Sequence, residues 1–294
     1  KVLHVEELTS SELRKAACCN LGESFETNAS VDVNMTDAVS GAKKIRMMGL
    51  EGIYTQIQLE NMPFLRGIES SFGLETIPGS WIESIQITKG AGNVVNGYES
   101  MAGLINLELA KPETMDRFYF NAYQNRMGKS EINLMSGIEL NEKWSTGIFA
   151  YLSSQWGQLD ENSDDFMDIP LGSYAAFLGR LDYEGEKMEA KFGMNIHLDT
   201  KLGGQVGYVD EPNAFGWNND WGIDQSKFGL QINSDHIDVF SKTGFFGKHP
   251  SQSIGIITKW KYEMIDGNFG TRFFAGEEKR AYINIIYDDI IKTS

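Results

Sequence analysis

The sequence predicts a small N-terminal α+β domain followed by a run of antiparallel β-strands, and three observations support this fold class. The 294 residues include 31 glycines, 17 Phe, 11 Tyr and 6 Trp but only 6 prolines, a composition that favours strands and tight turns over helix bundles. From residue 118 onward, apolar and polar residues alternate with a period of two. Just before the alternating region lies Lys111-Pro112-Glu113, where the proline has no N–H to donate to a neighbouring strand and so interrupts the β-pattern. We therefore expect domains at residues 1–115 and 116–294.

The chain is acidic, which limits the classes of partner. It has 26 Lys and Arg against 41 Asp and Glu, so its formal net charge is -15. No nucleic-acid partner is expected, because such binding needs a basic face. No segment has the roughly 18 to 20 consecutive apolar residues of a membrane-spanning helix, which leaves soluble proteins and β-barrels. Residues 1–7 contain no secretory signal, so we expect either a cytoplasmic chain or a start further upstream.

The N-terminal domain is predicted to open with a helix. Thr9 is a candidate N-cap, and Glu12 follows at the capping-box spacing, so the helix is expected to run to about Phe25. Short β-rich segments separated by glycine-bearing turns come next. The predicted strands are residues 43–48, 55–59, 81–88 and 104–109.

The second half of the chain alternates most clearly at residues 187–198. One side of this strand is apolar throughout, while the other carries Lys187, Glu189 and Lys191. Such a contrast is typical of a lipid-facing barrel strand. The pattern recurs at residues 131–140, 144–152, 228–232 and 254–262, and about eight strands of this type are predicted.

The predicted connections alternate between short turns and long loops. Residues 141–143, 185–186 and 247–250 are short, whereas 155–173 and 199–226 are long and acidic. Outer-membrane barrels show this alternation, with the short turns on the periplasmic side. A soluble β-sandwich with one buried face also alternates with a period of two, so the alternation alone leaves both architectures open.

Four segments then occur in a specific order: IRMMGL at 45–50, ENMP at 60–63, IPGSWIESIQITKG at 77–90 and VVNGYESMAGLINL at 94–107. Together they resemble the plug domain of TonB-dependent outer-membrane receptors. Residues 15–25 also resemble an early helix of the Bacteroidetes-type members. The resemblance favours a plug domain followed by transmembrane barrel strands, and it places the protein in the cell outer membrane.

The resemblance also implies that the barrel is incomplete. Receptors of this family have 22 strands, whereas about eight are predicted here. A closed barrel of eight strands has room only for its own side chains, so it cannot hold a plug of about 110 residues. We therefore expect the chain to be a fragment that contains the plug and the first part of the barrel.

The function implied by the resemblance is gated active uptake of a scarce nutrient such as a siderophore, metal chelate, glycan or vitamin. The implied partners are TonB with its inner-membrane energising complex, outer-membrane lipid, a small-molecule or oligomeric substrate and, in some members, a surface lipoprotein. No enzymatic activity and no cofactor are expected, since no nucleophile motif is present. The alternatives are a soluble secreted β-rich ligand-binding module and a small outer-membrane barrel or adhesin with an external domain.

Candidate substrate-binding residues combine aromatic rings with polar neighbours, which suits stacking on a ligand. The tryptophans among them could equally anchor or pack loops. The candidates are Phe64, Arg66, Glu69, Phe72, Glu75, Trp156, Trp217 and Trp221. Gating or structural roles within the plug are implied by the resemblance for Arg46, Gly49, Lys89, Gly90, Gly97, Gly103 and Asn106.

Three further motifs are predicted not to be functional sites. The glycine-rich run at 89–97 has Val95 where a dinucleotide loop needs its third glycine. Residues 160–164 copy the start of a calcium loop, but Asp165 and Leu171 occupy its glycine and glutamate positions. Cys18 and Cys19 point about 100° apart on a helix, so they do not predict a metal site. The four scattered histidines form no ligand motif, and His197 is expected to be polar lining.

Overall fold

The computed structural model describes residues 5–9, 12, 21–25, 30–37, 39–67, 74, 77–92, 99–210, 222–247, 249 and 252–289. The chain divides into two compact units. The first contains residues 1–110, 158–170 and 203–206, and the second contains 111–157, 171–202 and 207–294. Among the described residues, no helix is both long and apolar enough to cross a membrane.

The first unit contains two sheets. A five-stranded sheet has the order β1 (Val5–Thr9), β7 (Ile82–Lys89), β8 (Gly103–Leu109), β5 (Thr55–Leu59) and β6 (Met62–Phe64). A second sheet consists of β2 (Val31–Asp37), β3 (Ala42–Met47) and β4 (Leu50–Glu51). The helices within the described part of this unit are short, namely α2 (Leu21–Ser24), η1 (Gly52–Tyr54) and η4 (Gly79–Trp81). Its core includes Ile85, Ile87, Ile105 and Leu107, all fully buried.

The four strands predicted for the N-terminal domain correspond to β3, β5, β7 and β8, with ends that differ by one residue at most. The predicted helix start is only partly described. Thr9 is the last residue of β1, a strand that was not predicted, and its N–H donates to Glu12 Oε2 over 2.8 Å. This is the reciprocal hydrogen bond of a capping box. Residues 13–20 lie outside the described residues.

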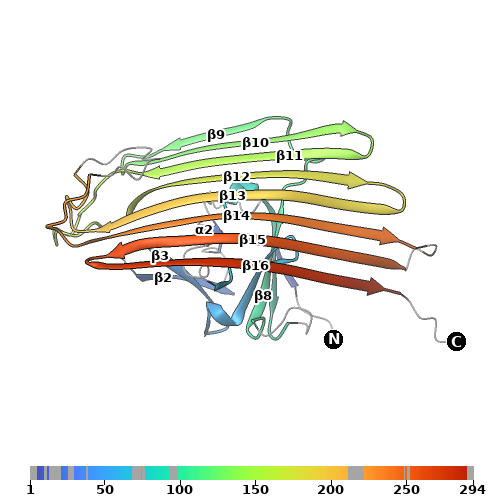
Figure 1. The fold of residues 1–294 in the computed structure, drawn as a ribbon, viewed down its shortest axis with the longest axis horizontal. Helices are drawn as coiled ribbons and strands as arrows, with labels where there is room; N and C mark the ends of the chain where they lie inside the picture. The colour runs from blue at the N-terminus through green and yellow to red at the C-terminus, as the bar shows by residue number, and fades with distance from the viewer. Residues whose placement is uncertain are drawn as a thin grey trace. The chain divides into compact units, whose positions relative to one another are not determined.

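The second unit is one antiparallel sheet of eight strands that neighbour each other in chain order (Figure 1). Its edges are β9 and β16, which are not hydrogen-bonded to each other, so the sheet is open. The prediction of about eight antiparallel strands that do not close into a barrel is therefore confirmed. The strands are β9 (Tyr119–Gln124), β10 (Lys129–Asn141), β11 (Trp144–Gln155), β12 (Leu171–Glu184), β13 (Met188–Gly204), β14 (Gly229–Phe246), β15 (Ser253–Phe269) and β16 (Arg272–Asp288).

One loop boundary was predicted wrongly. The second long loop was expected to begin at Asp199, but β13 continues to Gly204 and pairs Leu202 with Leu171 of β12. The continuation keeps the pairing register with β12 as far as Leu202, although burial no longer alternates there and Leu202, Gly203 and Gly204 are all buried. Polar composition had suggested a loop there, whereas pairing with β12 decides the structure.

Candidate functional site

The eight-stranded sheet of the second unit exposes apolar side chains and buries polar ones, which is the reverse of the distribution in a soluble protein. On β13, Phe192, Met194 and Leu198 are 42%, 40% and 43% exposed, whereas Asn195 and His197 are 3% and 1% exposed. Successive side chains of a strand point to opposite faces, so one face is apolar and exposed and the other is polar and buried. This is the distribution expected of a membrane barrel wall.

The same distribution extends over the neighbouring strands. Large apolar side chains on the exposed face include Ile148, Phe177, Val239, Trp260, Ile283 and Ile285. One prediction of faces is corrected at the start of β14, where Leu230 and Ile232 are buried and share the side of His236 and Asp238. The apolar side chains of Leu230 and Ile232 therefore belong to the buried face, whereas Phe228, just before the strand, is exposed.

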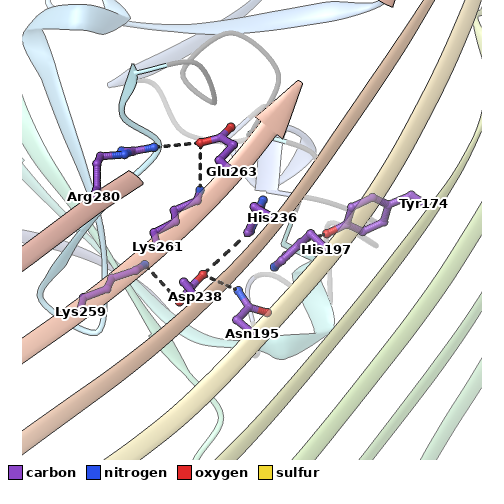
Figure 2. Close-up of polar contacts among 9 residues, drawn as sticks. All are labelled: Tyr174, Asn195, His197, His236, Asp238, Lys259, Lys261, Glu263 and Arg280. Carbon is purple, nitrogen blue, oxygen red and sulfur yellow. Dashed lines mark hydrogen bonds and ion pairs between the residues drawn. The ribbon is translucent and has the colours of Figure 1, made fainter. Parts of the chain in front are cut away.

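A cluster of charged side chains lies on the buried face and is centred on Asp238 of β14 (Figure 2). Its Oδ1 lies 3.4 Å from Lys259 Nζ, and its Oδ2 accepts a hydrogen bond from Asn195 Nδ2 over 3.4 Å. His236 Nε2 is 3.9 Å from the same Oδ2. One carboxylate thus links strands β13, β14 and β15.

Glu263 of β15 holds the second half of this cluster. Its Oε2 accepts a hydrogen bond from Arg280 Nη2 over 3.0 Å and lies 3.6 Å from Lys261 Nζ (Figure 2). Arg280 Nε is also 2.9 Å from Glu278 Oε1 on β16. The cluster therefore balances three cations against three carboxylates, as burial of charge requires. We call these six charged residues, together with Asn195, His197, His236 and Tyr174, the polar ladder.

Two imidazole rings stack inside the polar ladder. The ring centroids of His197 and His236 are 4.1 Å apart with an interplanar angle of 24°. The Tyr174 hydroxyl forms a short hydrogen bond with His197 Nδ1 (Figure 2). His197 was predicted as polar lining, whereas His236 was not singled out. The available signal was that Asp238 follows His236 at i+2, which places both on one face.

A separate ion pair occupies the same face of β12. Arg180 donates from Nη2 to Asp182 Oδ2 over 2.7 Å and from Nε to Oδ1 over 3.1 Å. This two-pronged geometry is the strong form of an arginine–carboxylate contact. Both side chains are buried.

The structure describes three of the eight predicted substrate residues. Phe64 lies on β6 and is only 2% exposed, so its ring packs in the core of the first unit. Arg66 Nε pairs with Glu99 Oε2 at 2.5 Å. Trp156 is partly buried, and its backbone N–H donates to the Gly128 carbonyl over 3.0 Å. Glu69, Phe72, Glu75, Trp217 and Trp221 lie outside the described residues.

The residues given gating or structural roles lie mostly in the turns and strands of the first unit. Arg46 is exposed on β3, and Lys89 Nζ pairs with Glu6 Oε2 at 3.1 Å. Gly49 and Gly90 have φ of +76° and +86°, which glycine adopts without strain. A Cβ on Gly103 would overlap the Met47 side chain, so β8 approaches β3 closely there. Gly97 lies outside the described residues.

Asn106 holds a tight turn within the first unit. The β5–β6 hairpin turns through Glu60 and Asn61, whose φ values of +54° and +61° are both left-handed. The Asn61 N–H donates to Asn106 Oδ1 over 2.8 Å, and Glu60 Oε1 accepts the Leu109 N–H over 3.1 Å. The turn is therefore fastened to β8, the strand that leads out of the unit.

The acidic loop at 160–168 uses its carboxylates to organise its own backbone. Asp160 accepts the N–H groups of Asp164 and Asp165 over 3.1 Å each, and Asp168 accepts that of Glu161 over 2.7 Å. Across the described residues, no group of three His, Cys, Asp or Glu side chains could hold a metal ion. Cys18 and Cys19 lie outside those residues.

The first unit also exposes large apolar side chains that the sequence did not single out. They lie on and beside the β3–β4 hairpin and η1, and the Ala102 N–H bonds to the Tyr54 carbonyl over 2.8 Å, which brings residue 101 next to η1. Contiguous exposed apolar surface commonly marks an interaction site. We call these five residues the apolar rim: Met48, Leu50, Ile53, Tyr54 and Met101.

Comparison with known proteins agrees with this geometry. Residues 3–104 match the family model described as the TonB-dependent Receptor Plug Domain. No curated protein sequence matches the chain.

Solved structures share the fold of the chain at low sequence identity. A mutant of the ferric enterobactin receptor of Pseudomonas aeruginosa in complex with enterobactin superposes with a TM-score of 0.59 at 14% identity, covering 97% of this chain and 46% of the receptor. The siderophore receptor PirA of Acinetobacter baumannii gives 0.59 at 13%, covering 94% and 43%. The ferric-catecholate import receptor Fiu of E. coli K12, in its open form, gives 0.63 at 10%, covering 98% and 45%. The chain therefore spans less than half the length of these receptors.

Proposed function

We propose, from the premise that residues 3–104 are a TonB-dependent receptor plug domain, that the chain carries the plug and the first wall strands of an outer-membrane receptor for active nutrient uptake. The observation that carries the proposal is the reversed sheet, with Phe192, Met194 and Leu198 exposed and Asn195 and His197 buried. A soluble binding module would expose the polar face and bury the apolar one.

The dimensions of the exposed apolar face support a place in a bilayer. The even-numbered side chains from Met188 to Leu198 are all apolar, and these ten steps advance about 33 Å at 3.3 Å per residue, or about 25 Å along the membrane normal at a barrel strand's tilt of about 40°. A barrel strand needs an apolar band about 25 Å tall on its lipid side. Trp144 and Tyr183, whose ring centroids are 4.8 Å apart, lie beside the short turns, where an aromatic girdle would meet the headgroups.

The polar ladder suits the wall of a water-filled transport path. Its charges are paired within the sheet, so the wall needs no external counter-ion when its surroundings change. Asp238 and Glu263 also cross-link neighbouring strands through their side chains, which keeps the wall rigid while a plug moves. In this proposal TonB supplies the force for that movement.

The proposed substrate is a small metal chelate that contacts the apolar rim of the first unit during its passage. Thioether and aromatic side chains such as Met48, Met101 and Tyr54 suit the apolar faces of a chelator. Receptors with this fold include one solved with enterobactin, which supports a chelate over a glycan. Sugar sites would instead need several polar hydrogen-bonding groups beside the rings.

The proposal is tested with the complete receptor, expressed from its full reading frame in paired strains with and without TonB. We expect the protein in the outer-membrane fraction, soluble only with detergent, and accumulation of radiolabelled iron supplied as a ferric catecholate only when TonB is present. Uptake that is independent of TonB, or a monomer that stays soluble without detergent, would contradict the proposal. Uptake of a different chelate would leave the transport function and correct the substrate.

A further inference from the structure

Two segments belong to the first unit although the strands that they continue belong to the second unit. Residues 158–170 connect β11 with β12, and residues 203–206 end β13 and begin the next loop. They are joined by backbone hydrogen bonds, from Met167 N–H to the Gly204 carbonyl over 2.8 Å and from Val206 N–H to the Asp165 carbonyl over 3.0 Å. Phe166 and Gln205 form an antiparallel bridge between them. We call the two segments the loop seat.

The turn between β2 and β3, which we call the 37–41 turn and of which residues 37 and 39–41 are described, packs against the loop seat through Val39 and Gly41. A Cβ on Gly203 would overlap the Val39 carbonyl oxygen, so the two backbones touch there. A Cβ on Gly41 would lie 2.9 Å from Pro170 Cγ. Ser40 between them is buried. The contact thus consists of backbone and small side chains at two positions.

Both partners in this contact are held by hydrogen bonds of their own. Asp37 Oδ1 accepts the Val39 N–H over 3.2 Å, and Asp37 Oδ2 accepts the Ser40 N–H over 3.1 Å. The loop seat is fixed by the carboxylates of the acidic loop, such as Asp168, and by its own backbone hydrogen bonds. Two closely packed surfaces either fit or separate, because packed interiors do not deform gradually.

The turn is also linked to the surface proposed to meet the substrate. β3 runs from the 37–41 turn at Ala42 to Met47, and Met48 of the apolar rim follows directly. The six residues of β3 therefore separate the 37–41 turn from the apolar rim, and β3 is held by β2 on one side and β4 on the other. A displacement at one end of this strand is transmitted to the other.

We propose that the loop seat is a latch for the 37–41 turn, and that this contact must release before β3 and the apolar rim move within the first unit. The latch couples the long loops, which are continuous with β11, β12 and β13, to β3 and the apolar rim. The inference rests on the proposed transport function.

The first experiment disrupts the close contact between the loop seat and the 37–41 turn by adding one methyl group at Gly203. Gly203→Ala in the complete receptor introduces the Cβ that overlaps Val39, and Gly244→Ala on β14, where a Cβ would meet nothing within 4 Å, is the matched control. We expect amide hydrogen exchange of residues 37–42 to rise about tenfold or more in Gly203→Ala and to stay unchanged in Gly244→Ala. Equal exchange in the two variants would overturn the latch. This measurement needs neither ligand nor transport, so it separates failure of the latch from failure of the proposed function.

The second experiment closes the latch covalently. Gly41→Cys with Pro170→Cys places two Cβ atoms near the separation of about 3.5 to 4.5 Å that a disulfide needs, in a background where Cys18 and Cys19 are replaced by Ser. We expect the oxidised receptor in planar bilayers to show about tenfold fewer urea-evoked openings than the reduced one. Equal opening of both forms, or failure of the cross-link to form, would overturn the latch. Absence of any opening from the reduced receptor would argue against the transport proposal, and the exchange experiment would then decide the latch.

Discussion

Asp238 Oδ1 and Lys259 Nζ lie 3.4 Å apart on adjacent strands, and neither side chain is more than 7% exposed. They are diagonal neighbours, since Asp238 is directly opposite Lys261 and Lys259 is directly opposite Phe240. A buried pair of this kind adds little to stability against an apolar pair of similar size, but loss of one partner leaves a buried charge without compensation.

We therefore predict that Asp238→Asn destabilises the complete receptor by about 3 kcal/mol. The double variant Asp238→Asn with Lys259→Met is expected to recover most of that loss, because it removes the uncompensated ammonium group. Thermal unfolding in detergent, followed by circular dichroism, measures both variants. Losses that simply add in the double variant would contradict the pairing.

The exposed face of β13 gives the second prediction. Met194→Arg is expected to weaken folding into lipid vesicles by about 2 to 4 kcal/mol, because it places a charge at mid-depth on the lipid side. Glu189→Arg, at an exposed position near the short turn of the same strand, is the control and should change folding by less than about 1 kcal/mol. Urea titration of folding into vesicles measures the difference. Equal effects at the two positions would count against lipid contact.

The β5–β6 turn gives the third prediction. Asn106→Ala removes the acceptor of the Asn61 N–H and leaves a strained turn without its support, so we expect a loss of about 1 to 3 kcal/mol in the first unit. Asn34→Ala, at an exposed position on β2, is the control and should change stability by less than about 0.5 kcal/mol. Amide hydrogen exchange of residues 55–64 measures the loss of stability in the β5–β6 hairpin itself. Unchanged exchange in Asn106→Ala would show that the turn is held by other contacts.

The edge strand β1 gives the fourth prediction. Glu6 Oε2 pairs with Lys89 Nζ at 3.1 Å and accepts a hydrogen bond from Ser30 Oγ over 3.1 Å, with both charged groups more than a third exposed. Such a pair contributes about 0 to 1 kcal/mol and is screened by salt. Hydrogen exchange of residues 5–9 should therefore rise slightly between about 0.05 M and about 1 M salt in the native protein, and should be less sensitive to salt in Glu6→Gln. The same salt response in both proteins would exclude the pair as a support of β1.

The strands at residues 187–198 and 104–109 were predictable from local features, because their side-chain pattern follows from strand geometry in one dimension. The choice of a barrel over a sandwich came instead from the resemblance of residues 45–107 to a plug domain. The extension of β13 to Gly204 was not predictable from local features, because it depends on pairing with β12. The start of β14 was misassigned for a related reason. Alternation at Leu230 and Ile232 shows that two faces differ, but it does not say which one is buried.

The polar ladder was mostly invisible in the sequence. Contacts such as Glu263 with Arg280 join residues on different strands, and their distance depends on the register between β15 and β16. The same limit applies to Phe64, whose strand of three residues carries too short a pattern to show that its ring points into the core. The apolar rim was missed because exposure of Met48 or Ile53 cannot be read from residue type.

The most direct test of the account is the environment of the two faces of β13. Spin labels are attached to Phe192→Cys, Met194→Cys and, as the opposite face, Lys191→Cys in the complete receptor reconstituted in lipid vesicles, with Cys18 and Cys19 replaced by Ser. The account predicts that labels at 192 and 194 collide readily with oxygen dissolved in lipid and rarely with a water-soluble nickel reagent, while the label at 191 shows low oxygen collision. Free access of the nickel reagent to labels at 192 and 194 would contradict a lipid-facing wall, and with it the proposal that the chain is part of an outer-membrane receptor.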